Sequence, residues 1–217
     1  MTSPRLVLAS HNQGKLRELR ELLRDRVEGL DVETEVVDAG AVGAPDVTET
    51  GVSFAENSLL KARAVTRATG LPAVADDSGL CVDVMNGAPG IFSARWSGRH
   101  GDDAANLELL LAQLEDVPEE HRGARFRCAA SLALPGGEER VEHGEMPGSL
   151  LRAPRGTGGF GYDPIFVPAE LPVDLAGRTA AEVPPEVKNA LSHRGRALEA
   201  LVPHVRRALG AGSEGRE

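Results

Sequence analysis

The chain has 217 residues, of which 41% are hydrophobic and 26% are charged, and its formal net charge at neutral pH is −9. Such a length and composition are typical of one globular domain with a core of its own, and the acidic balance excludes a general nucleic-acid binder, whose binding face is basic. No apolar run has the length of a membrane span or a signal peptide, and Cys81 and Cys128 lie far apart in apolar runs, as free core thiols do. We therefore expect a cytoplasmic protein that has no nucleic-acid or membrane partner.

The start of the chain predicts a strand, a loop and a helix. Residues 5–9 are apolar, residues 10–14 are loop-like, and leucines recur at helical spacing from Lys15 onward. Backbone N–H groups at a helix start, together with one ammonium group, form a natural seat for phosphate. The segment is not the common phosphate-loop motif, because the first glycine is missing and Leu16 replaces Ser or Thr. An ordinary helix start is the alternative.

A second strand is expected near residues 30–37. Ser53 and Glu56 then form a capping box, which predicts a helix that runs to about Thr69 and carries Lys61.

Two adjacent carboxylates follow the next apolar run. Residues 71–75 predict a buried strand that ends at Asp76 and Asp77, and residues 80–84 predict a further strand after a turn. Carboxylates at such a strand end can hold Mg²⁺, or can take a proton from an attacking water molecule. Asp-Asp-Ser-Gly is also good turn chemistry, so a plain turn is the alternative.

The second half predicts a helix, a hairpin and a glycine-rich segment. Residues 102–114 are amphipathic, residues 124–134 and 138–147 read as a hairpin, and residues 150–168 are glycine-rich and β-like. A final helical region is expected over residues 184–209. The order of strands and helices predicts an α/β fold.

The glycine-rich segment contains the letters of the dinucleotide fingerprint at residues 156–161, but no helix follows, because Pro164 interrupts an extended stretch. We interpret it instead as a loop that brings Phe160 and Tyr162 to the surface of a cleft, where an aromatic face could stack on a base. Core aromatics in a β-bend are the alternative.

The last helical region is interrupted at residues 192–195. Arg194 falls among apolar positions there, where it could read carbonyl oxygens or form a structural salt bridge. Of the 24 basic residues, only Lys15, Lys61 and Lys188 are lysines, so these three are candidates for a task that needs a compact ammonium group, such as binding a phosphate.

Several longer motifs occur together, and in this order they resemble one family, the non-standard purine nucleoside triphosphate pyrophosphatases that act on inosine and xanthosine triphosphates. The motifs are SHNQGK (10–15), FAENSLLKARA (54–64), ADDSGL (75–80), GAPGIFSARWSG (87–98), GTGGFGYDPIF (156–166) and KNALSHRG (188–195).

The chain has no repeats and no linker, so a single domain is expected over residues 1–217, and the polar residues 210–217 predict a frayed tail. The resemblance runs from about Leu6 to Leu201 and implies that this domain has two lobes. It implies an elongated mixed β-sheet with flanking helices, a central cleft between the lobes, and a homodimer. The implied reaction is Mg²⁺-dependent hydrolysis of ITP, dITP or XTP to the monophosphate and pyrophosphate.

The resemblance also implies residue roles. Asp77 would be the proton acceptor and a metal ligand, with Glu49 and Asp76 as further metal carboxylates. Lys15 and Lys61 would face phosphate. The implied substrate contacts are Ser10, His11, Asn12, Gln13, Gly14, Lys15, Lys61, Ser78, Phe160, Gly161, Tyr162, Asp163, Lys188, His193 and Arg194, of which the members from Phe160 onward would bind the base.

The chain departs from the family pattern at two points. Thr48 precedes Glu49 where relatives often have a second acid, and His11 stands where many have glycine. Two other functions stay open: a pyrophosphatase of related fold that acts on modified pyrimidine nucleotides, and a non-catalytic nucleotide-binding module.

Overall fold

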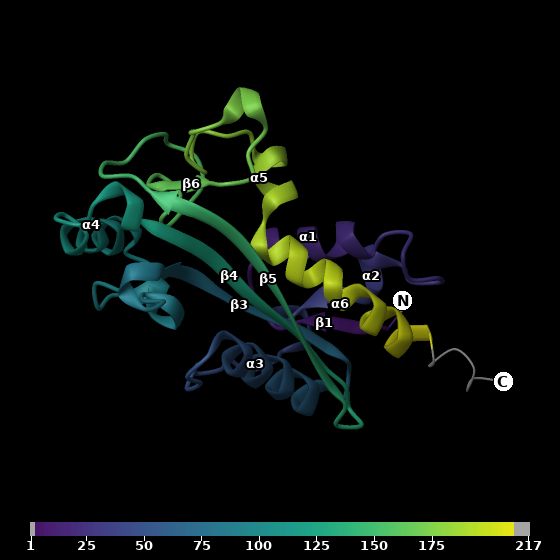
Figure 1. Cartoon of the computed structure of the whole chain (residues 1–217). Helices are drawn as coiled ribbons and strands as arrows, with labels where there is room; N and C mark the ends of the chain where they lie inside the picture. The colour runs from purple at the N-terminus through teal and green to yellow at the C-terminus, as the bar shows by residue number, and fades with distance from the viewer. Residues whose placement is uncertain (1–2, 211–217) are drawn as a thin grey trace. The chain divides into compact units, whose positions relative to one another are not determined.

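The structure is a computed structural model, and it describes residues 3–210. Within this range six strands form one mixed sheet in the order β2-β1-β3-β4-β5-β6, accompanied by helices (Figure 1). The strands are β1 (Leu6–Leu8), β2 (Val36–Asp38), β3 (Ala73–Val82), β4 (Gly123–Ala133), β5 (Glu139–Leu150) and β6 (Phe166–Pro168). The α-helices are α1 (Gln13–Leu23), α2 (Val32–Glu35), α3 (Phe54–Thr69), α4 (Asp103–Gln113), α5 (Pro185–Leu191) and α6 (His193–Gly210). The predicted α/β fold with a mixed sheet and flanking helices is confirmed.

The chain divides into two compact units. Unit 1 consists of Met1–Asp77, Ala129–His143 and Arg194–Glu217, and unit 2 consists of Ser78–Cys128 and Gly144–His193. Strands β3, β4 and β5 each contribute residues to both units.

In unit 1, β1 lies between two parallel neighbours. Val7 is in register with Val37 of β2 on one side and with Ala73 of β3 on the other. The chain therefore leaves β1 toward one neighbour and later returns to its other side, which is the arrangement that leaves a ligand-binding crevice at the carboxyl ends of parallel strands. Since β1 ends at Leu8, β3 continues beyond it.

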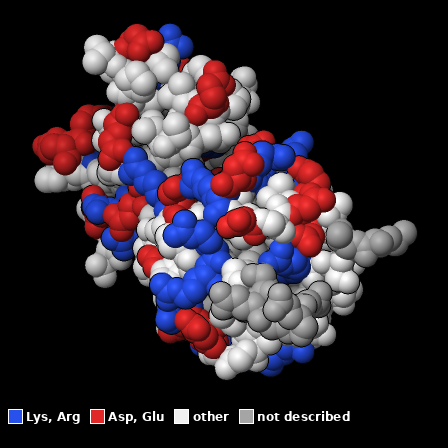
Figure 2. All heavy atoms as spheres, turned by 90° about the vertical axis from the view of Figure 1, so that its right-hand side faces the viewer, with Lys and Arg blue, Asp and Glu red and all other residues white. Residues whose placement is uncertain are grey.

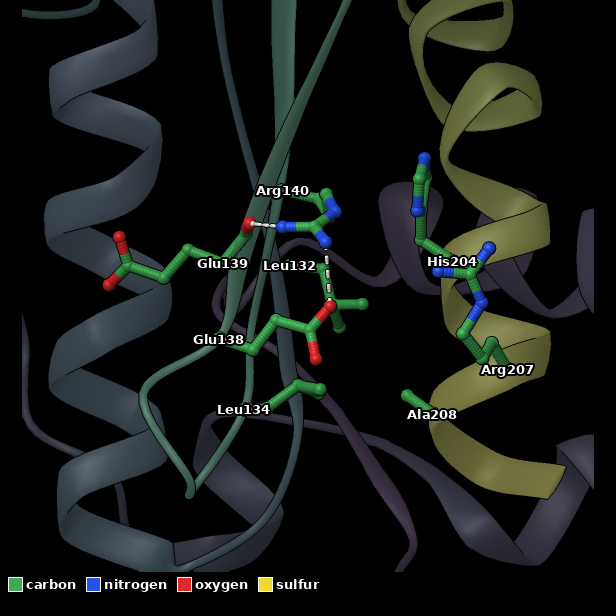
Figure 3. A pocket seen from close by; sticks show the side chains of 8 residues that line it. All are labelled: Leu132, Leu134, Glu138, Glu139, Arg140, His204, Arg207 and Ala208. Atoms are coloured by element: carbon green, nitrogen blue, oxygen red, sulfur yellow. Dashed lines mark hydrogen bonds and ion pairs between the residues drawn. The ribbon is translucent and has the colours of Figure 1, made fainter. Parts of the chain in front are cut away.

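Helices α3 and α6 lie on opposite sides of the strands of unit 1 (Figures 1 and 3). On the α3 side, the hydroxyl groups of Ser58 and Ser131 lie 2.7 Å apart, and Thr66 Oγ1 donates to the carbonyl of Ala133 at 3.1 Å. Helix α6 buries an apolar stripe that includes Leu198 and Leu201. The strands are thus covered on both faces.

Charged side chains contribute less to the stability of the fold than buried aliphatic side chains do. Basic and acidic side chains lie next to one another over much of the face in Figure 2. Exposed ion pairs of this kind are worth about 0–1 kcal/mol each, so the buried aliphatic side chains supply most of the stability.

Unit 2 has its own core and a buried cation. Leu80, Leu110 and Phe166 are fully buried in one apolar cluster. The guanidinium of Arg122 is buried beside it and donates to the carbonyls of Leu114, Leu150 and Leu151 at 2.6, 2.9 and 2.8 Å. Arg122 therefore ties the end of α4 to the end of β5.

Most predicted elements are confirmed: the first strand and helix, the capped helix that ends at Thr69, the helix over residues 103–113, the hairpin and the interrupted final helix. The two cysteines are buried and form no disulfide, as predicted. No helix in the described range has the length and hydropathy needed to cross a membrane. The predicted tail, beyond Gly210, lies outside the described residues.

Two predicted strands are shorter than expected. Residues 32–35 form α2, because the Asp31 carboxylate accepts a hydrogen bond from the backbone of Glu33 at 3.0 Å and caps a helical turn, so only Val36–Asp38 is a strand. In the glycine-rich segment only Phe166–Pro168 is a strand.

Candidate active site

The two adjacent aspartates lie inside a strand. β3 runs without a break from Ala73 to Val82, so the predicted strand end at Asp76 and Asp77 and the predicted turn after them are both wrong. Gly79 serves close packing there, since a Cβ atom at this position would collide with the carbonyl of Gly90. Because side chains alternate along a strand, the two carboxylates point to opposite faces of the sheet.

Asp76 is held by two cations within unit 1. Its Oδ2 lies 2.9 Å from Lys15 Nζ and 3.1 Å from Arg194 Nε, and the residue is only 4% exposed. Burial by itself would raise the pKa of Asp76, but Lys15 and Arg194 outweigh it and hold the pKa well below its usual range. Arg194 also pairs with Glu18 at 3.3 Å. Asp76 is thus the buried anion of a small ion-pair network.

Lys15 is positioned by the capped start of α1. Asn12 Oδ1 accepts hydrogen bonds from the backbone N–H groups of Gly14 and Lys15 at 2.8 and 3.1 Å, and the Asn12 N–H donates to Ser10 Oγ at 3.2 Å. The Gln13 side chain donates to Asp38 at the end of β2. The loop is therefore fixed at the carboxyl ends of β1 and β2.

On the α3 face, Asp77 meets a second lysine. Lys61 Nζ lies 3.6 Å from Asp77 Oδ1 and 2.7 Å from Glu49 Oε1, and Asn57 Nδ2 donates to Asp77 Oδ2 at 3.2 Å. Burial raises the pKa of Asp77, the charges of Glu49 and Asp76 raise it further, and Lys61 and Asn57 only partly oppose them. Burial lowers the pKa of Lys61, but Asp77 and Glu49 outweigh this effect and keep Lys61 charged.

A pocket of about 260 Å³ opens at this place in unit 1. Its lining includes two lysines and three acids, and the polar side chains that line it are Ser10, His11, Lys15, Asp46, Glu49, Lys61 and Asp76. Both lysines line it, Lys15 from α1 and Lys61 from α3. Two ammonium groups beside a helix start are suited to a chain of phosphates.

A second group of predicted residues lies in unit 2. Lys188 Nζ contacts the carboxylate of Asp163 and lies 4.7 Å from the centre of the Phe160 ring. Asp163 is buried, and its Oδ2 also accepts a hydrogen bond from the Phe160 N–H at 2.8 Å. Phe160 itself is 68% exposed, so a flat ring is presented with a cation beside it.

The profile of the Ham1 family matches residues 6–204. The chain belongs to the Ham1 family. It is 63% identical to a dITP/XTP pyrophosphatase of Streptomyces coelicolor, over 95% of this chain and 99% of the relative. It is 55% identical to one of Nocardia farcinica, over 94% of this chain and 95% of the relative.

Solved structures agree with this assignment. A crystal structure of a nucleoside-triphosphatase / dITP/XTP pyrophosphatase from Mycobacterium abscessus has a TM-score of 0.76 at 54% identity, and the match covers 92% of this chain and 99% of that one. A HAM1 protein from Coxiella burnetii has a TM-score of 0.82 at 42% identity, covering 95% and 100%. The family resemblance predicted from the motifs is confirmed.

Within this Ham1-family chain, the predicted base-binding residues have different surroundings. Tyr162 is not at the surface as expected: it is 4% exposed, its hydroxyl donates to the carbonyl of Ser93 at 3.0 Å, and burial raises its pKa. His193 stacks on Phe126, with ring centres 5.1 Å apart and an interplanar angle of 16°. Arg194 belongs to unit 1, where it pairs with Asp76. Gly161 donates from its backbone to Asp103 at 2.8 Å, and Ser78 is partly buried in β3.

The carboxylates of Glu49 and Asp77 fit a metal ion that takes only part of its ligands from the protein. In the described residues no group of three His, Cys, Asp or Glu side chains is arranged to hold a metal. One ammonium group, that of Lys61, contacts both Glu49 and Asp77, so one cation can lie between these two acids. Mg²⁺ usually takes one or two carboxylates and fills its remaining positions with water and phosphate oxygens. Asp76 is engaged by Lys15 and Arg194, which makes Glu49 and Asp77 the better pair.

Sequence reasoning missed the part played by Asn57. Besides its bond to Asp77, its Oδ1 accepts from the Gly51 N–H at 2.8 Å, so it fastens the end of the loop that carries Glu49. The available signal was its position one turn before Lys61 on α3.

Proposed function

We propose that this protein hydrolyses non-standard purine nucleoside triphosphates (dITP, XTP and ITP) to the monophosphate and pyrophosphate, which clears deaminated purines from the nucleotide pool. Near-full-length relatives named dITP/XTP pyrophosphatase support this proposal. The observation that carries it in the structure is the pocket at the end of β1, where Lys15 and Lys61 stand beside Asp76 and Glu49. When a triphosphate binds, its oxygens can replace the carboxylates as the partners of these two lysines.

Lys15 and Lys61 bind and orient the phosphates. Each ammonium group is paired with a carboxylate, so it is held in place before substrate arrives and costs little further ordering when it binds. The N–H groups at the start of α1 add partial positive charge on the same side. Together these groups would stabilise the negative charge that develops on the leaving pyrophosphate.

Asp77 is the proposed general base. Its raised pKa makes it a better proton acceptor than an ordinary carboxylate, and its Oδ2 is oriented by Asn57. It takes a proton from a water molecule, whose oxygen attacks the α-phosphorus while the bond from that phosphorus to the bridging oxygen breaks and pyrophosphate leaves. Glu49 and Asp77 would hold Mg²⁺, which when bound neutralises phosphate charge.

Phe160 and Lys188 are the proposed base-reading group. The exposed ring would stack on the purine, and the ammonium beside it would donate to a 6-oxo group. Adenine carries an amino group at that position, so the ammonium group of Lys188 would have no acceptor there, at a cost of about 1–3 kcal/mol.

We further propose a cytoplasmic homodimer, on the basis of the family resemblance. Light scattering of the purified protein tests the assembly: a molar mass twice that of the chain supports it, and a monomer at all concentrations contradicts it.

The function is tested by pyrophosphate release with Mg²⁺ and a panel of ITP, dITP, XTP, GTP, ATP, dTTP and dUTP. We expect the first three to be turned over fastest. Faster hydrolysis of dTTP or dUTP would instead support a pyrimidine nucleotide pyrophosphatase. Binding of a triphosphate with no turnover of any would support a non-catalytic module.

A further inference from the structure

A second pocket of unit 1 lies between the β4–β5 hairpin and the last turns of α6 (Figure 3). We call it the hairpin pocket; its volume is about 230 Å³, and it shares no lining residue with the pocket that contains Lys15 and Lys61. The lining side chains that carry the argument are Leu132, Leu134, Ala208, Arg140, His204 and Arg207.

The alternation of the hairpin strands explains the apolar part of this pocket. Ser131 and the carbonyl of Ala133 bond to α3, so Leu132 and Leu134 belong to the opposite side, which faces α6 (Figure 3). Ala208 contributes only a methyl group from α6, which leaves space between the helix and the two leucines. The pocket thus has a small apolar floor.

Most of the charged side chains that line this pocket are paired with an opposite charge. Glu138 pairs with Arg140 at 2.8 Å, Glu139 pairs with Arg63 at 2.6 Å, and His204 bonds to Glu142 at 3.2 Å. Arg207 lines the same pocket, and its side chain makes no hydrogen bond or ion pair with any other residue from 3 to 210. The pocket therefore offers one uncommitted guanidinium above an apolar surface.

We propose that the hairpin pocket binds a small carboxylate with an apolar body. A guanidinium accepts a carboxylate through two parallel hydrogen bonds, and Leu132, Leu134 and Ala208 would cover the apolar part. The volume is below the usual range for drug-sized ligands, which limits the ligand to about the size of one aromatic ring. This binding site is separate from the proposed catalysis and does not depend on it.

Benzoate is the probe, and NMR chemical shifts of the full chain are the measurement. We expect saturable shifts of the backbone amides of Leu132, Leu134 and Ala208, with half-saturation on the order of 1 mM. Benzamide, which has the same shape without the charge, should bind at least about fivefold more weakly, and so should inorganic phosphate, which lacks an apolar body.

The variant Arg207→Gln removes the charge from an exposed position and should weaken benzoate binding by about fivefold or more. Arg206→Gln is the matched control, because Arg206 is also exposed and adjacent on α6 but does not line the hairpin pocket. Ala208→Leu, which fills the floor, should weaken binding as well.

The proposal is overturned if benzoate gives no saturable shifts at these amides up to 20-fold above the expected half-saturation, or if Arg207→Gln binds it as the parent protein does. Equal binding of benzamide, or of phosphate, would likewise contradict a site for amphipathic carboxylates. Triphosphate turnover does not enter these readouts, so a failure of the proposed function leaves the result intact.

Discussion

Asp76 and Asp77 are neighbours in β3, yet their carboxylates contact lysines from different helices: Asp76 lies 2.9 Å from Lys15 of α1, and Asp77 lies 3.6 Å from Lys61 of α3. The pKa values of the two acids are consequently shifted in opposite directions. Two cations hold the pKa of Asp76 low, whereas burial and the neighbouring acids raise that of Asp77. This contrast supports the proposed role of Asp77 as the general base, and the two ion pairs of Asp76 indicate a structural role for that residue.

The variant Asp77→Asn should lose catalysis and gain stability. Asparagine removes the proton acceptor, so we expect pyrophosphate release from ITP to fall by about 10²–10⁴-fold. The folded state raises the pKa of Asp77. Between the pKa of the unfolded chain and that of the folded protein, the folded protein therefore binds more protons, and stability is lost as the pH rises through this interval. Neutralisation removes this penalty, so urea unfolding at pH 7 should show a higher midpoint than in the parent protein. Full activity of the variant would rule out Asp77 as the base.

The variant Asp76→Asn should show the reverse effect on stability. It leaves Lys15 and Arg194 without their buried anion, which should cost about 3–5 kcal/mol of unfolding free energy at pH 7. The pKa of Asp76 is lowered in the folded state, so its contribution is present above the ordinary carboxylate value of 3.8 and is lost as the pH falls through the folded value. Urea unfolding should therefore show a difference between parent and variant at pH 7 that begins to shrink only below pH 3.8. An equal difference at every acidic pH would contradict this assignment.

Local signals in the sequence predicted the helices, because periodic leucines and capping residues act within a few residues of one another. Ser53 caps α3 through the Glu56 N–H at 3.2 Å, as its spacing predicted. The same local reasoning failed at Asp-Asp-Ser-Gly, where turn-forming residues lie in a long strand because Gly79 packs against the distant backbone of Gly90.

Long-range contacts also determine where the aromatic and charged side chains lie. The sequence predicted that Phe160 and Tyr162 lie together at a surface. Tyr162 is instead buried, and its hydroxyl donates to the carbonyl of Ser93, which lies 69 residues away in the sequence. Arg194 is adjacent to His193 in sequence, yet its partners are Asp76 and Glu18. No local pattern contains such information.

The three lysines should respond differently to replacement by arginine, which keeps the charge but changes the shape of the cation. Lys15→Arg and Lys61→Arg should each reduce turnover of ITP by about tenfold or more, because a guanidinium cannot take the place of a compact ammonium between a carboxylate and a phosphate. Lys188→Arg should mainly change the ratio of ITP to GTP turnover. Arg17→Lys on the exposed face of α1 is the control. Unchanged kcat and preference in all three variants would contradict the assigned roles.

Activity should depend on a divalent cation held by Glu49 and Asp77. Chelation with EDTA should abolish pyrophosphate release, and added Mg²⁺ should restore it. Glu49→Gln removes one anionic ligand, so the Mg²⁺ concentration for half-maximal activity should rise by about tenfold. Asp46→Asn, on the same loop and lining the same pocket, is the matched control and should shift it much less. An equal shift in both variants would point to general charge on the loop and not to a ligand at Glu49.

Arg122 should be among the most important single side chains for the stability of unit 2, although no sequence motif marks it. Replacement by methionine keeps the apolar stem but leaves the carbonyls of Leu114, Leu150 and Leu151 without their donor. Each unmet buried acceptor costs about 1–3 kcal/mol, so the unfolding free energy should fall by about 3 kcal/mol or more, measured by urea unfolding. Arg125→Met is the control, because Arg125 pairs with Asp83 at 2.9 Å near the surface, and the loss of such a pair should cost about 1 kcal/mol or less. If the two variants unfold at the same midpoint, the hydrogen bonds of Arg122 do not stabilise the junction of α4 and β5.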